Sequence, residues 1–199
     1  MKPAARLLLA STTALAAPSA HAHLMETGFG PFYDGLAHVA ATPADLMMVL
    51  ALALLAGQRG TTAARYALFA LPLAWLAGGL LGARWPGAGA LPLWTTLSFL
   101  LVGALVALDA KVRGIGVAAI AILAGVVHGF VNGATMGPSG ASGLALTGAV
   151  AAVFCLTAIV AAEISALPAG WLRIAVRVAG SWIAAAGLLM LGWLARTTV

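Results

Sequence analysis

The sequence predicts an all-α membrane protein, a polytopic bundle of about six transmembrane helices that follows a cleaved signal peptide. Three observations support this prediction: the composition, a basic and then apolar N-terminus, and six apolar runs. Of the 199 residues, 63% are hydrophobic and only 8% are charged. A soluble domain of this size leaves much of its surface in water and could not hide so many apolar side chains. Lipid must cover them, so the lipid bilayer is the first predicted partner.

Residues 1–22 have the three parts of a secretory signal peptide. Lys2 and Arg6 precede a short apolar stretch at 7–17, and the small-residue pattern Ala20-His21-Ala22 follows. Cleavage after Ala22 would leave residues 23–199 as one transmembrane domain that begins outside the cytoplasm. An uncleaved first span is the alternative, but the apolar stretch is too short to cross about 30 Å of hydrocarbon.

Six apolar runs of the mature chain predict the spanning helices. Each crossing needs about 20 residues, so the short first run must borrow from residues 36–42 or lie in a thinned region of the bilayer. Glycine, proline and polar residues separate the runs, and the rest of the mature chain shows no repeat or soluble domain. The runs cover residues 43–56, 63–81, 91–108, 115–131, 143–164 and 174–195.

The basic side chains predict the orientation of the bundle. If the mature N-terminus is periplasmic, the odd-numbered connections face the cytoplasm, and these connections carry most of the positive charge. This asymmetry is typical of a multi-pass protein of the bacterial inner membrane. The basic residues are scattered singly and form no patch, so a nucleic-acid partner is excluded. The predicted cytoplasmic residues are Arg59, Arg65, Lys111, Arg113, Arg173 and Arg177, against Arg84 and Arg196 on the other side.

The fourth run carries the strongest local pattern. Glycines recur every four residues at 125, 129, 133 and 137, and they predict a smooth helix face for close packing. Offset from this face, His128 and Asn132 lie four residues apart on one side of the helix. A neutral imidazole can bind a borderline metal ion, and an amide oxygen can add a weaker ligand. The alternative is that His128 only donates a hydrogen bond to a backbone carbonyl and ties two helices together.

A second candidate group precedes the first run. His38 is followed by Thr42, Pro43 and Asp45. Thr42 and Asp45, three residues apart with a proline between them, are typical of a helix N-cap and its capping-box acid. Asp45 would then be structural, although a capped carboxylate keeps lone pairs with which it could also bind a metal ion.

Three further residues raise a functional question. His23 would begin the mature chain, where its amine and imidazole could chelate a divalent ion together, or it is merely tolerated beside the cleavage site. Glu163, near the end of the fifth run, is either a proton or cation relay or a side chain that reaches the headgroups. Cys155 is the only cysteine, so no disulfide framework within the chain is possible, and it is interpreted as a small packing residue. The chain has no phosphate loop, catalytic triad or His-Glu-x-x-His motif, so it is not expected to be an enzyme or to hold a permanent cofactor.

These residues resemble the HupE/UreJ family, small membrane proteins that are associated with hydrogenase and urease gene clusters and considered nickel or cobalt permeases. The resemblance covers nearly the whole chain. Of the family motif H-P-x-x-G-x-D-H the chain keeps His38 and Asp45, and of H-G-x-x-H-G it keeps His128 with its glycines. Leu46 and Asn132 stand where these motifs have a further histidine.

The resemblance implies movement of a divalent transition-metal ion, nickel or cobalt, across the inner membrane. The ion would enter at an external site and pass between the first and fourth spans, and fewer nitrogen ligands imply weaker binding. A non-transporting accessory or structural subunit is the alternative, with a second copy of the chain or a metalloenzyme-maturation protein as its partner. The implied metal-site residues are His23, His38, Asp45, His128 and Asn132.

Overall fold

All regular secondary structure in the described part of the chain is α-helical. The computed structural model describes residues 27–197 except 87, 89–90, 137–141 and 169, so the predicted signal peptide and His23 lie outside the described residues. The predicted all-helical membrane bundle is confirmed. Its helices are α2 (Pro31–Ala41), α3 (Pro43–Gln58), α4 (Thr61–Gly82), α5 (Pro92–Ala107), α6 (Gly114–Met136), α7 (Ser142–Ala166) and α8 (Trp171–Thr197).

Each of the six predicted apolar runs coincides with one helix, but the described residues give four or five candidate membrane spans instead of about six. Four helices, α4, α6, α7 and α8, are long and apolar enough to cross a membrane by themselves. The pair α2 and α3 also qualifies, but it is bent by 75° at its break. The remaining apolar helix, α5, has 16 residues, which corresponds to about 24 Å at 1.5 Å per residue.

The bend between α2 and α3 changes the interpretation of the first span. Thr42 has an extended backbone (φ −95°, ψ 103°), because the ring of the following proline disfavours the helical conformation for the residue before it. Residues 31–41 therefore form a separate helix instead of lengthening α3. That helix packs against α7, where Gly35 meets the backbone of Ala145 and Gly148 meets the backbone of Phe32.

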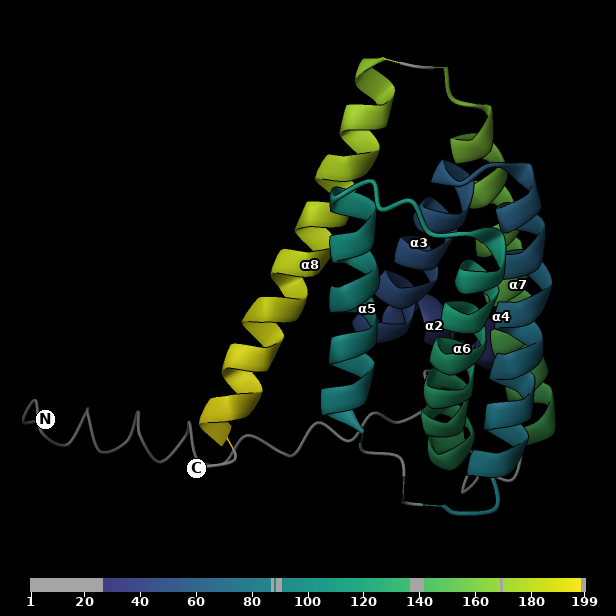
Figure 1. Ribbon diagram of the computed structural model, residues 1–199. Helices are drawn as coiled ribbons and strands as arrows, with labels where there is room; N and C mark the ends of the chain where they lie inside the picture. Colours follow the sequence, from purple (N-terminus) through teal and green to yellow (C-terminus); the bar gives the residue numbers. More distant parts are fainter. Residues whose placement is uncertain (1–26, 87, 89–90, 137–141, 169, 198–199) are drawn as a thin grey trace, which may run out of the picture.

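The helices run alternately up and down (Figure 1). Helices α5 and α8 pack together on one side of the molecule, α4 and α7 lie on the other side, and α3 runs between them. The α3–α4, α5–α6 and α7–α8 connections lie at the upper end in Figure 1. These connections and the adjoining turns of α4 and α8 hold the six basic residues that the sequence assigns to one side of the membrane. We call this the basic end.

Candidate functional site

The glycine face predicted on α6 is its contact with α4. A Cβ atom added at Gly129 would lie 2.8 Å from the Cα of Trp75, and one added at Gly133 would lie 2.8 Å from the Cα of Gly79. Gly125 meets the same helix at Leu71. Only glycine, whose side chain is a single hydrogen atom, allows two helix backbones to come this close. The predicted close packing is confirmed at these three glycines, whereas Gly137 lies outside the described residues.

Three buried polar side chains from α3 and α6 meet beside this contact. The Nδ1 atom of His128 is 2.7 Å from Asp45 Oδ1, and Asn132 Nδ2 donates to Asp45 Oδ2 over 2.8 Å. Asp45, His128 and Asn132 are 2%, 0% and 1% exposed. Residues 83 positions apart in the sequence thus form one polar cluster in an otherwise apolar bundle.

Helix α5 adds a fourth member to this cluster. The Nε2 atom of His128 is 2.8 Å from Ser98 Oγ, and the Ser98 hydroxyl donates to the carbonyl of Thr95 over 2.7 Å. A serine hydroxyl has one proton. While the hydroxyl proton of Ser98 points to the carbonyl of Thr95, Nε2 of His128 must carry a proton and donate it to Ser98 Oγ. If the hydroxyl proton turns to His128 instead, Nε2 accepts that hydrogen bond and the imidazole ring is neutral. The cluster can therefore exist with or without a positive charge on the imidazole.

Trp75 of α4 forms the wall behind the imidazole. The Trp75 and His128 ring centroids are 5.4 Å apart at an interplanar angle of 33°, and Trp75 is fully buried. The close α4–α6 contact thereby fixes the position of the histidine ring. Sequence reasoning missed both Trp75 and Ser98, although a serine within an apolar run is a signal that could have singled out Ser98.

The structure corrects the interpretation of Asp45 as a capping-box acid. Thr42 is the N-cap residue of α3 and Pro43 begins the first turn, as predicted, but no side chain caps this end. The backbone N–H of Thr42 donates to the carbonyl of His38, not to Asp45. Because Asp45 has partners on α6, its carboxylate serves a tertiary contact.

His38, the other predicted ligand within the described residues, is not hydrogen-bonded to this cluster. His38, which is 8% exposed, has Thr42 Oγ1 at 3.4 Å as its contact, and His23 lies outside the described residues. Within the described ranges, no group of three His, Cys, Asp or Glu side chains is placed to hold a metal ion. One atom of the cluster is nevertheless available, because Asn132 Oδ1 is buried and has no hydrogen-bond partner among the described residues.

The basic end of the bundle holds a second polar group, which is structural. Asp109 pairs with Arg59 and Lys111. Burial raises the pKa of Asp109, but the charges and hydrogen bonds of Arg59 and Lys111 outweigh this effect and hold the pKa below its ordinary value. Gln58 Nε2 donates to the carbonyl of Val106, and Arg177 Nε donates to that of Ala107. These contacts tie the last carbonyls of α5 to α3 and α8.

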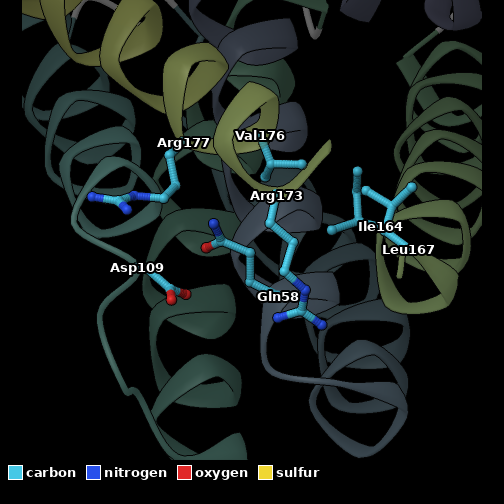
Figure 2. Close-up of a pocket in the computed structure, with 7 residues that line it drawn as sticks. All are labelled: Gln58, Asp109, Ile164, Leu167, Arg173, Val176 and Arg177. Carbon is cyan, nitrogen blue, oxygen red and sulfur yellow. The ribbon is translucent and has the colours of Figure 1, made fainter. Parts of the chain in front are cut away.

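A small cavity of about 20 Å³ lies among these groups, with Gln58, Asp109 and Arg173 around it (Figure 2). That volume suits about one water molecule. Two arginines line this cavity, and its carboxylate, that of Asp109, is already paired with Arg59 and Lys111. The polar cluster around His128 is therefore the candidate functional site.

Comparison with known proteins gives one match. The family model described as HupE / UreJ protein matches residues 9–190, which is most of the chain. No curated protein and no solved structure matches the chain.

Proposed function

Because the chain belongs to the HupE/UreJ family, a transporter-like membrane family linked to nickel and cobalt uptake, we propose that it moves one of these divalent ions across the bacterial inner membrane. The observation that carries the proposal is the buried Asp45–His128 pair with Asn132 beside it. The mature N-terminus would be periplasmic and the basic end cytoplasmic.

The geometry of the pair suits exchange of a proton for a metal ion. One proton bridges Nδ1 of His128 and Oδ1 of Asp45 over 2.7 Å. Nitrogen and oxygen ligands about 2.1 Å from an ion, at right angles to each other, are about 3 Å apart. The Nδ1–Oδ1 distance would then increase by only a few tenths of an ångström, while the carboxylate turns away from the Nδ1–H direction to admit the ion. The unpartnered Oδ1 of Asn132 would supply a further oxygen ligand.

The position of Asp45 supports entry from the end opposite the basic end. Asp45 lies in the first turn of α3, directly after the bend from α2. His38 lies on α2 one turn before that bend, and His23 would begin the mature chain. Both imidazoles would bind the ion transiently on its way to Asp45 and His128.

Uptake of radioactive nickel or cobalt into proteoliposomes tests the proposal. We expect Asp45→Asn and His128→Gln, which preserve side-chain size, to lower the initial uptake rate by at least about tenfold, because each removes a metal ligand. Asp34→Asn is the matched control. It also removes one nearly buried acid, but among the described residues Asp34 accepts hydrogen bonds from Thr27 alone. Unchanged uptake by the His128→Gln protein would refute the proposed site.

A non-transporting accessory subunit is the second candidate function. It is favoured by the small ligand set, since the described residues hold no cluster of three strong ligands. Thermal unfolding with and without nickel or cobalt separates the two functions, because an ion that binds only the folded protein raises its stability. An accessory role predicts no metal-dependent shift and no uptake.

A further inference from the structure

The outer surface of α7 carries a groove that the metal site does not use. The groove has a volume of about 270 Å³ and lies between α4 and α7 toward the basic end. Small side chains of α7 form most of its wall: Thr157, Ala158, Ala162 and Ser165. In a membrane, small residues let a neighbouring helix approach closely. This surface lies on the side of the bundle away from α8 (Figure 1).

Two charged side chains near the groove lack a partner. Arg65, in the second turn of α4, lines the groove, and Glu163 is one turn from the end of α7. Both are exposed, and neither makes a hydrogen bond or an ion pair within the described part of the chain. Because α4 and α7 run in opposite directions, the two charges lie at a similar depth. An unpaired charge near the hydrocarbon is unfavourable.

The helix geometry places the two charges on opposite flanks of one surface. Each residue of α7 is rotated by about 100° from the one before it. Ala161 and Ala162 both line the groove, whereas the next residue, Glu163, does not line it and is exposed on the flank of α7 away from α4. The exposed residues Cys155 and Ile159 occupy the surface between Arg65 and Glu163.

We propose that this surface is the interface of a two-fold symmetric dimer in which Glu163 of each copy pairs with Arg65 of the other. A two-fold axis along the membrane normal, passing in front of α7, brings the α4 flank of one copy against the Glu163 flank of its partner. Ile159 then enters the groove of the other copy. The dimer then contains two Arg65–Glu163 pairs, one in each half of the interface.

A second copy explains the surface better than a lipid headgroup does. An anionic headgroup would neutralise Arg65 but would leave Glu163 unpaired. Opposite charges on the two flanks of one face are what a self-complementary contact requires. The interface also leaves the cluster of Asp45 and His128 inside each copy, so every copy keeps its own candidate site.

Cysteine cross-linking in native membranes tests the dimer with the full chain. Cys155 is the only cysteine and lies near the proposed axis, so mild oxidation or a short bis-maleimide should give a species of twice the monomer mass. Cys155→Ser should abolish that species. Arg65→Glu or Glu163→Arg alone should each lower its yield by roughly tenfold through like-charge repulsion. The double charge exchange should restore it.

Two controls keep this test decisive. Arg84→Glu reverses an exposed charge at the opposite end of the bundle and should leave the cross-link unchanged. Glu163→Gln removes the negative charge without introducing a positive one, so it should not disturb membrane insertion of the chain. Because it still removes the ion pair with Arg65, it should lower the yield of cross-linked dimer. The dimer is refuted if Cys155 gives no cross-link in protein that is correctly inserted. It is equally refuted if the double exchange yields no more dimer than the single variants.

Discussion

Replacing Gly129 with alanine tests the packing that positions the candidate site. The added Cβ atom would lie 2.8 Å from the Cα and the carbonyl carbon of Trp75, and closer still to its carbonyl oxygen. Ordinary contacts of a Cβ atom begin at 3.4 Å. The atoms to be displaced are backbone, so no side chain can rotate away. Helices α4 and α6 must separate instead.

The expected cost follows from the size of this contact. Overpacking a well-packed interior by one methyl group costs about 1–3 kcal/mol, and sometimes more. A gap of about 0.5–1 Å removes a quarter to a half of the dispersion energy of the atoms that line it. Helices α4 and α6 share the most extensive contact in the bundle, so we expect about 3 kcal/mol. For a chain of this size, that corresponds to a Tm lower by roughly 6–12 °C.

Thermal unfolding in one detergent, with Gly192→Ala as the matched control, measures this effect. A Cβ atom at Gly192 in α8 would have no atom within 4 Å. The control should gain about 0.5–1 kcal/mol, because alanine favours a helix over glycine. The same chemical change is thus expected to act in opposite directions at the two sites. If the Gly129→Ala protein melts at or above the temperature of the Gly192→Ala protein, the close contact is not what stabilises the bundle.

Three further predictions concern single polar groups. Ser98→Ala leaves Nε2 of His128 buried without a partner and should lower the unfolding free energy by about 1–3 kcal/mol, whereas an unchanged Tm would contradict this role. Asn132→His adds an imidazole beside the carboxylate of Asp45 and should raise nickel affinity by about tenfold or more in calorimetry; unaltered affinity would remove these residues from the metal site. The folded-state pKa of Asp109 is lowered from 3.8, so its stabilising effect is complete above that pH and is lost as the pH falls through the folded-state value. The Asp109→Asn protein should therefore lack part of the acid destabilisation of the wild type, and identical acid transitions would exclude this contribution.

The sequence predicted the parts of the site that depend on one helix. The six helices follow from long apolar runs, and the α6 contact face follows from glycines four residues apart. The same helical spacing places His128 and Asn132 on one side. What spacing along one helix cannot give is the partner from another helix. Asp45 is 83 residues from His128, and Ser98 is 30 residues away.

The prediction that Asp45 is a capping-box acid failed for a physical reason. The pattern from Thr42 to Asp45 is typical of a local cap, and local bonds need no long loop to close. In this bundle the backbone N–H of Thr42 already donates to the carbonyl of His38. It is therefore not available as a donor to the carboxylate of Asp45. If Asp45 turned back to Thr42, Nδ1 of His128 and Nδ2 of Asn132 would both be buried without a partner. In an apolar interior, two unsatisfied groups cost more than one unformed cap.

The lengths of α3 and α5 explain how a carboxylate is tolerated at this depth. Each has 16 residues, or about 24 Å, and both begin at the end opposite the basic end, whereas the hydrocarbon core is about 30 Å thick. With their C-termini at the headgroups of the basic end, their N-termini would start inside the apolar layer. Asp45 lies in the first turn of α3, where the positive end of the helix dipole favours a negative charge. Because this field and the bonds to His128 and Asn132 together offset the desolvation of the carboxylate, a cation that replaces the shared proton meets a charge that the fold already stabilises.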